Sequence, residues 1–211
     1  MKKRLDKIFR LLYARYGPQD WWPGDTPFEV AVGAVLTQNT NWSNVERAIA
    51  NLKRAKALSA KRIHSMPDAE LASLIRPAGY FNVKARRLKS FVSHLVANHR
   101  GSMKRMAACD ADSLRRELLS VNGIGPETAD SILLYALEKP VFVIDAYTKR
   151  VLERHKIINP GMDYHGVQSL FHECFKPDVP FYNEYHAIFV MVGKDFCKPS
   201  ARCGECPLKK L

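Results

Sequence analysis

Apolar residues recur every three or four positions along most of this chain. The pattern is clearest in five stretches, formed by Leu5, Ile8, Phe9 and Leu12, by Val45, Ala48, Ile49 and Leu52, by Leu88, Phe91, Val92 and Leu95, by Ile132, Leu133 and Ala136, and by Tyr185, Ile188, Phe189 and Val192. This spacing gathers the apolar side chains on one side of an α-helix. We therefore predict an all-α fold.

Glycine and proline clusters separate these stretches and predict roughly eight to ten helices of ordinary length. One apolar segment, Val141 to Ile144, does not follow the helical spacing. At this length a strand and a buried entry to a helix are both compatible with the pattern. No other segment offers itself as a sheet partner for it.

Composition and charge narrow the class of protein. The chain has 211 residues, with 33 Lys and Arg against 21 Asp and Glu, a net charge of +12 and 46% hydrophobic residues. It can bury a core, and its charge predicts a polyanionic partner, with nucleic acid ahead of an anionic membrane surface. The longest apolar run, Val30 to Leu36, is too short to span a bilayer, and residues 1–6 lack the apolar core of a signal peptide. We expect a cytoplasmic protein, associated with the nucleoid in a prokaryote.

A sharp turn between two predicted helices has the composition of an anion-binding element. Residues 118–130 read as a helix, a Gly-x-Gly turn at Gly123 and Gly125, and a second helix with Pro126 in its first turn. Such a turn brings backbone N–H groups to the start of a helix, where a phosphodiester oxygen would fit. An ordinary helix-to-helix turn remains the alternative. A dinucleotide-binding fingerprint is excluded, because the third glycine is absent and a helix precedes the turn.

The hairpin belongs to a series of motifs that is similar to a known family. Residues 121–129, followed by Val143 to Tyr147, resemble the helix-hairpin-helix and catalytic aspartate of the endonuclease III superfamily of DNA glycosylases. Residues 36–40 and 79–85 look like the two DNA-probing loops of that family, and Cys197, Cys203 and Cys206 look like its iron–sulfur loop.

The resemblance implies a two-lobed helix-hairpin-helix glycosylase fold. A six-helix bundle or barrel is expected over residues 28–138, and a second helical lobe over residues 1–27 and 139–211, with the catalytic cleft between them. It also implies that the partner is duplex DNA carrying a damaged base. A monomer without membrane attachment is expected.

Asp145 is the predicted catalytic residue. Breaking an N-glycosidic bond develops positive charge on the sugar, which a fixed carboxylate stabilises. Asp145 directly follows an apolar segment that would hold it in place, and an Asp at this position is also typical of a helix N-cap. The two roles are compatible.

Position 127 predicts the type of reaction. Bifunctional members of the family carry a lysine there that forms a Schiff base, whereas this chain has Glu127, which cannot form an imine. The resemblance therefore implies a monofunctional glycosylase that uses water. The alternatives are an endonuclease III-like glycosylase and AP lyase that uses another lysine, for example one in the basic cluster from Lys84 to Lys89, and a DNA-binding module without catalysis. Glu127 would also suit the first turn of any helix.

The resemblance also assigns DNA contacts and a base pocket. A glycosylase must flip its target base out of the stack. Gln38 is the expected filler of the gap and Tyr80 the wedge, while Gly123, Gly125 and Thr128 are expected on the DNA backbone. Aromatic faces bind cationic rings, and the segment with Trp22, Pro23 and Trp42 looks like the 3-methyladenine DNA glycosylase III branch. Alkylated purines are the predicted substrates, and a mismatch uracil or thymine glycosylase is the alternative. Each tryptophan could instead pack in the core.

The cysteine loop predicts a metal centre. Cys197, Cys203 and Cys206 place three thiolates within ten residues, one fewer than a closed site needs. The family's fourth ligand would fall at position 212, beyond the printed sequence, so either the ligand lies further on or the site is completed differently. A structural 4Fe–4S cluster is expected, with zinc or no metal as alternatives, and Lys198 and Arg202 of this loop are expected to contact phosphates.

The histidines do not form a metal-binding motif in the sequence. His94 and His99 are five residues apart rather than four, so the pattern does not support a zinc protease helix.

Overall fold

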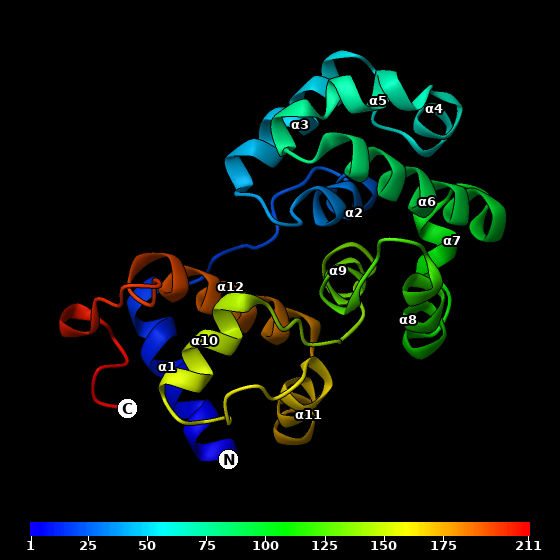
Figure 1. Cartoon of the computed structure of the whole chain (residues 1–211). Coiled ribbons are helices and arrows are strands. Elements are labelled where there is room, and N and C mark those ends of the chain that lie inside the picture. The colour runs from blue at the N-terminus through cyan, green and yellow to red at the C-terminus, as the bar shows by residue number, and fades with distance from the viewer. The chain divides into compact units, whose positions relative to one another are not determined.

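The computed structural model describes all 211 residues as an all-helical protein (Figure 1). It has twelve α-helices, two short 3-10 helices, one π-helical turn and no strand. The chain forms two compact units, one of Met1–Trp22 with Pro140–Leu211 and the other of Pro23–Lys139. We call these unit 1 and unit 2 and describe each by itself.

Unit 1 joins the two ends of the chain. Its helices are α1 (Lys2–Tyr16), α10 (Ala146–Arg154), α11 (Tyr164–Cys174), α12 (Val179–Asp195) and the 3-10 turn η3 (Cys203–Glu205). Helix α12 packs against both α10 and α1 (Figure 1). The buried Tyr185 hydroxyl on α12 donates a hydrogen bond of 2.7 Å to the Leu5 carbonyl on α1. The N-terminal helix is therefore part of the core of this unit.

The apolar segment before α10 is neither strand nor helix. Its backbone groups bond to side chains on one face of α11, where Tyr164, Gln168 and His172 follow one another at every fourth residue. The Phe142 N–H donates to His172 Nε2 at 3.0 Å, Gln168 Nε2 donates to the Phe142 carbonyl at 2.7 Å, and the Ile144 N–H donates to the Tyr164 hydroxyl at 3.3 Å. Side chains of one helix thus satisfy backbone groups that would otherwise need a neighbouring strand.

Unit 2 is built around a helix that is buried on all sides. Its helices are α2 (Pro27–Leu36), α3 (Trp42–Arg54), α4 (Ala60–Ser65), α5 (Asp68–Leu74), η1 (Arg76–Ala78), α6 (Phe81–His99), α7 (Met103–Ala107), α8 (Ala111–Ser120), α9 (Pro126–Ser131) and the π-helical turn η2 (Ile132–Ala136). Every residue of α2 from Glu29 to Leu36 is buried. Thr26 caps α2 by accepting a hydrogen bond from the Glu29 N–H, and Pro27 occupies its first turn.

The helix count differs from the sequence prediction, and one lysine of the basic cluster is buried. Twelve α-helices form instead of eight to ten, because α4, α5, α7 and α9 are only five to seven residues long. On α6, Val83 is 36% exposed, whereas Lys84, a member of the basic cluster, is 1% exposed. Lys84 lies four residues before Leu88 and seven before Phe91, so helical geometry turns it inward with them.

The predicted hairpin is present. Helix α8 ends at Ser120, Gly123 has a φ of 85°, and Gly125 is the N-cap of α9. The left-handed backbone at Gly123 is one that residues with a side chain rarely adopt.

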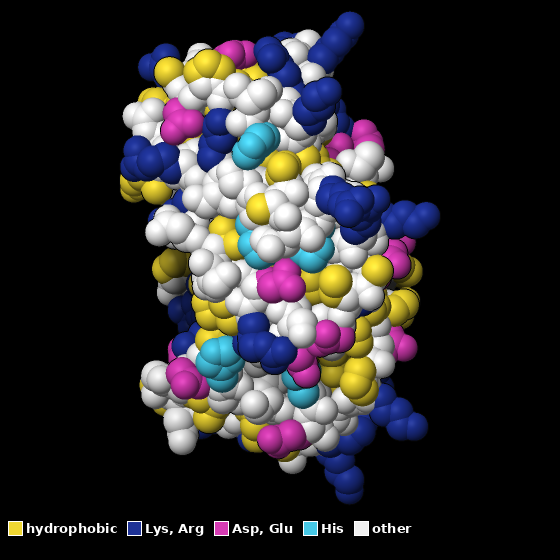
Figure 2. Space-filling view, turned by 90° about the vertical axis from the view of Figure 1, so that its right-hand side faces the viewer, with side chains coloured by type: hydrophobic (Ala, Val, Ile, Leu, Met, Phe, Trp, Pro, Cys, Tyr) yellow, Lys and Arg dark blue, Asp and Glu magenta, His cyan; other side chains and the backbone are white.

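The surface carries the excess of basic residues. Figure 2 shows Lys and Arg side chains scattered over the face drawn, with hydrophobic side chains in small spots between them. None of the helices combines the length and the apolar character that crossing a bilayer requires.

Candidate active site

Asp145 is the N-cap of α10. Its Oδ1 accepts a hydrogen bond of 2.7 Å from the Thr148 N–H, and the positive end of the helix faces the carboxylate. The Asp145 side chain keeps 11% of its surface exposed. The carboxylate is therefore fixed in direction on a largely buried side chain.

His186 on α12 is a neighbour of Asp145 that the sequence did not reveal. Its Nε2 lies 3.6 Å from Asp145 Oδ2. Burial acts to raise the pKa of Asp145, but the attraction of His186 and the hydrogen bond from Thr148 outweigh it, so the pKa lies below its ordinary value. The group at this position is an ionised carboxylate at neutral pH.

In unit 2, Gln38 binds the hairpin directly. Its Nε2 donates to the Gly123 carbonyl at 3.0 Å and to Thr128 Oγ1 at 2.9 Å, while Arg87 Nη1 donates to its Oε1 at 2.6 Å. The sequence predicted Gln38, Gly123 and Thr128 as DNA-contacting residues, and the structure brings these three together. The first probing loop and the hairpin therefore form one hydrogen-bonded group.

Arg87 explains why residue 123 is glycine. A Cβ atom at Gly123 would overlap the Arg87 side chain, whose Cγ lies against the Gly123 backbone. This close approach, together with the left-handed φ, makes any other residue strained there. Gly125 has open space around it, so no neighbouring atom requires a glycine there. It serves as the N-cap of α9.

Tyr80 is the most exposed large hydrophobic residue. It is 73% exposed and adopts a left-handed φ of 46° immediately before α6, next to Gly79 with a φ of 69°. A left-handed tyrosine is uncommon and occurs mainly where the surroundings hold it there. This geometry presents the aromatic ring to solvent, where a DNA wedge would need to be.

The buried Lys84 side chain connects the starts of the two probing loops. Lys84 Nζ donates to the Leu36 carbonyl at 2.9 Å, at the start of the first probing loop, and to the Ala78 carbonyl at 2.7 Å, just before the second. Burial, with a smaller effect of Arg87, lowers the pKa of Lys84 to about 8. The sequence placed Lys84 in a basic cluster, and the structure buries it.

Lysines of this cluster are poor candidates for a Schiff-base nucleophile. Lys84 Nζ is buried and bonded to two carbonyls. Lys89 Nζ donates to the His64 and Met66 carbonyls. Glu127, at the position of the family's lyase lysine, is exposed in the first turn of α9.

Trp42 and Pro23 line a cavity of about 330 Å³ in unit 2. Trp42 is half-buried at the start of α3. Trp22 is not among the lining residues; it is half-buried and packs edge-on against Trp21, with ring centroids 6.0 Å apart. The structure thus brings together two of the three residues predicted for the base pocket.

The cavity is lined by carboxylates that the sequence analysis did not select. Asp25, Glu29 and Glu46 contribute three acidic groups against one amine, that of Lys53. Lys53 Nζ lies 2.7 Å from both Asp25 Oδ2 and Glu29 Oε1, and these hydrogen bonds raise its pKa. Glu46 follows Trp42 by four residues on α3, so the two side chains share a helix face. The lining is acidic in a protein of net charge +12.

The cysteine loop is held on α10 by two arginines. Arg150 Nε donates to the Cys197 carbonyl at 2.6 Å, and Arg154 donates to the Lys198 carbonyl at 2.6 Å and to Cys197 Sγ at 3.3 Å. Cys197 and Cys206 are buried and Cys203 is exposed. Lys198 is half-buried and Arg202 is exposed. Burial, with smaller effects of Cys197 and Cys203, raises the pKa of Cys206.

Comparison with known proteins identifies the family. Residues 32–177 match the family described as HhH-GPD superfamily base excision DNA repair protein. This match covers more than half of the chain and includes both probing loops, the hairpin and Asp145. The chain belongs to the HhH-GPD superfamily and is a DNA repair glycosylase of that family.

Individual relatives agree with the family. A protein of Methanocaldococcus jannaschii named "Putative DNA repair glycosylase MJ1434" is 48% identical over 207 residues, which cover 97% of this chain and 94% of the relative. The structure of 3-methyladenine DNA glycosylase (MagIII) of H. pylori bound to 1,N6-ethenoadenine matches with a TM-score of 0.75 and 30% identity, covering 92% of this chain and 95% of that one. An endonuclease III in a non-covalent complex with DNA matches with a TM-score of 0.85 over 100% of this chain and 94% of that one; at 21% identity it shows the fold.

The buried Lys84 amine generates a prediction about stability. In Lys84→Met the Leu36 and Ala78 carbonyls lose their donor, which should lower the free energy of unfolding by about 2 kcal/mol at pH 7. The folded-state pKa of Lys84, about 8, lies below its ordinary value of 10.5, so the unfolded chain binds more protons on this group between these pH values. The stability of the wild type relative to Lys84→Met should therefore rise from about pH 8 to pH 10.5.

Urea unfolding at several pH values measures both effects. Lys61→Met, at an exposed lysine on α4, is the matched control and should change the stability little. Equal stability of Lys84→Met and wild type, or a difference that shrinks as the pH rises, would contradict this role for Lys84.

Proposed function

We propose that this protein is a monofunctional DNA glycosylase that releases alkylated purines, such as 3-methyladenine, from duplex DNA by hydrolysis. The observation that carries the proposal is the ionised Asp145 carboxylate, fixed at the N-terminus of α10. The cavity beside Trp42 supports the choice of substrate.

Asp145 suits the stabilisation of an oxocarbenium-like transition state. Its negative charge is present before the substrate arrives, and the Thr148 hydrogen bond holds its direction, so no reorganisation is needed when positive charge develops on the sugar. His186 remains close to the other carboxylate oxygen and helps to keep the group ionised. The lowered pKa of Asp145 means that this charge persists under mildly acidic conditions.

Water is the nucleophile in this proposal. An imine requires a free amine at the sugar carbon, and position 127 offers a carboxylate. The two lysines at either end of the basic cluster, Lys84 and Lys89, already donate to backbone carbonyls. The product should be an intact abasic site.

Borohydride trapping tests the absence of a covalent intermediate. Wild-type protein incubated with its substrate duplex and borohydride should give no stable protein–DNA adduct, and purified protein should not nick abasic DNA above background. A bifunctional endonuclease III assayed in parallel is the positive control. An adduct formed by the wild type would overturn the hydrolytic mechanism, and loss of that adduct in Lys84→Met or Lys89→Met would identify the amine.

The substrate preference follows from the charge of the Trp42 cavity. Methylation at N3 of adenine or N7 of guanine makes the purine a cation and a good leaving group, so the pocket needs stacking and negative charge more than an acid catalyst. The face of Trp42 suits stacking on a cationic ring, and Glu46 lies one turn further along the same helix. MagIII, the relative matched at 30% identity, is named for 3-methyladenine and was solved with a modified adenine.

A panel of lesions with a charge-neutral variant tests this preference. The wild type should release 3-methyladenine and 7-methylguanine faster than hypoxanthine, uracil, thymine opposite guanine or oxidised pyrimidines. Glu46→Gln should lower kcat/KM for the cationic bases by about fivefold to tenfold and leave neutral hypoxanthine nearly unchanged. Glu70→Gln, at an exposed position of α5 outside the cavity, is the matched control.

Two outcomes would contradict the substrate assignment. One is release of only uracil, mismatched thymine or oxidised pyrimidines by the wild type. The other is an equal loss of activity on cationic and neutral bases in Glu46→Gln, which would indicate a structural effect.

We also propose that Cys197, Cys203 and Cys206 supply three ligands of a 4Fe–4S cluster. Their fit to such a group rests on the placement of three cysteines in one loop, two of them, Cys197 and Cys206, buried. A cluster would act as a structural crosslink of this loop, with a fourth ligand from outside the three cysteines. The arginines of α10 would hold the loop that presents Lys198 and Arg202.

Iron analysis checks the cluster. Anaerobically purified wild type should be brown, with close to four iron atoms per chain expected for this cluster type. Cys203→Ser should lose the colour and the iron, whereas Cys174→Ser on α11, outside the loop, should keep both. Colourless, iron-free wild type would refute the proposed cluster.

A further inference from the structure

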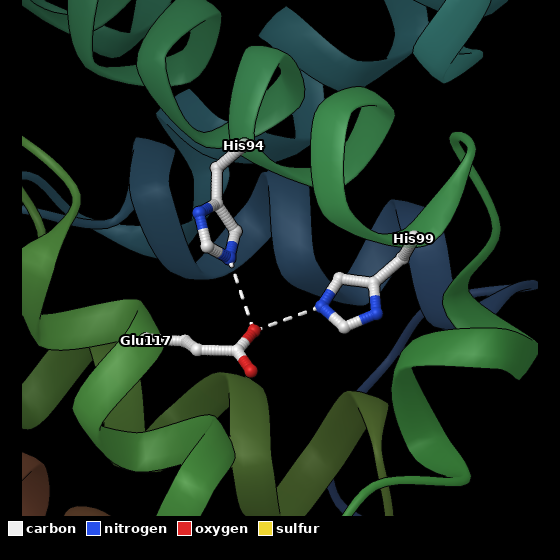
Figure 3. A group of neighbouring side chains, drawn as sticks. All are labelled: His94, His99 and Glu117. Atoms are coloured by element: carbon white, nitrogen blue, oxygen red, sulfur yellow. Dashed lines mark hydrogen bonds and ion pairs between the residues drawn. The ribbon is translucent and has the colours of Figure 1, made fainter.

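Two histidines and a glutamate converge in unit 2, away from every residue assigned above. His94 and His99 both lie on α6, and Glu117 lies on α8. Figure 3 shows the two imidazole rings pointing from α6 toward the same carboxylate oxygen of Glu117. The three ligand atoms lie within 4.8 Å of one another.

The distances are close to those of a tetrahedral metal site. Glu117 Oε2 lies 3.3 Å from His94 Nε2 and 2.9 Å from His99 Nε2. Ligand bonds of about 2.0 to 2.2 Å around zinc place neighbouring ligand atoms about 3.3 to 3.6 Å apart in a tetrahedron. The His94 pair already has this separation, and the His99 pair needs to open by a few tenths of an ångström.

The Nε2 atom of His94 has no well-formed hydrogen bond. Its Nε2 is buried and, although 3.3 Å from Glu117 Oε2, lacks the geometry of a hydrogen bond. Its Nδ1 lies 3.1 Å from the Asn98 side-chain amide. The same amide nitrogen donates to the His94 backbone carbonyl at 3.1 Å, so Asn98 holds the orientation of the ring as an outer group around a metal site does. The arrangement supplies both the ligand atom and the group that orients it.

We infer that His94, His99 and Glu117 form a binding site for a divalent transition metal of the zinc type. Two imidazoles and a carboxylate are ligands that zinc prefers, and three protein ligands leave a fourth position for water. His99 is 6% exposed at its side chain and Glu117 is 36% exposed, so the metal would sit at the edge of the core and could be reached from solvent.

The position of this site gives it a structural role. The metal links the last turns of α6 to α8, and α8 leads directly into the Gly123 turn. Bound metal should therefore hold the first helix of the hairpin against α6. A ligand that binds only the folded state raises its stability.

Zinc titration of chelator-treated protein tests the site. Wild type should bind one more equivalent of Zn²⁺ than Glu117→Gln or His94→Gln, and in these variants the affinity at this site should fall by at least about 100-fold. Saturating Zn²⁺ should raise the Tm of the wild type by about 5 °C and leave that of the variants nearly unchanged. His64→Gln, at an exposed histidine on α4, is the matched control and should behave like the wild type.

Co²⁺ distinguishes this site from the cysteine loop. Co²⁺ bound by nitrogen and oxygen gives visible absorption without the near-ultraviolet band of a cobalt–thiolate bond, and this signal should vanish in Glu117→Gln and persist in Cys203→Ser. If the wild type and both ligand variants take up the same number of Zn²⁺ equivalents, the proposal is wrong and the three residues are only a hydrogen-bonded cluster. Circular dichroism of the metal-free variants shows that any loss of binding is not a loss of folding.

Discussion

The hydrogen bond from the Thr148 N–H to Asp145 is the constraint on which the proposed chemistry depends. It makes one side chain both the start of α10 and a charged group of fixed direction. The segment before it has no strand partner, and α11 holds that segment through Tyr164, Gln168 and His172. The position of the carboxylate is thus set by α10, which begins at Asp145, and by α11, which holds the segment before it. Electrostatic preorganisation requires a charged group that is fixed in this way.

A second set of interactions, within unit 2, connects the elements assigned to DNA. Lys84 connects the start of the first probing loop to the residue just before the second, and Gln38 joins the first loop to the hairpin. The Lys84 bonds explain why a basic helix contributes a buried amine, and the Arg87 side chain beside the hairpin explains why residue 123 is glycine. Gln38 must give up its bonds to Gly123 and Thr128 before it can fill a gap in DNA.

The sequence predicted what local chemistry determines. Helical periodicity, the glycine turn with Pro126, and an Asp after an apolar segment each depend on a few neighbouring residues, and the all-α fold and the hairpin are confirmed. Contacts between distant segments were missed: His186 beside Asp145 and the carboxylates around Trp42 have no signal in their own neighbourhoods. The burial of Lys84 did have a local signal, because Lys84 lies in register with the apolar face of α6.

The most direct test of the central claim is single-turnover release of 3-methyladenine by Asp145→Asn. Asparagine also caps helices, so α10 should keep its N-terminus while the negative charge is lost. We expect the rate of base release to fall by about 10² to 10³-fold, with the affinity for lesion-containing duplex unchanged. A rate within a few-fold of wild type would contradict the role of Asp145 and favour a protein that binds DNA without using this carboxylate.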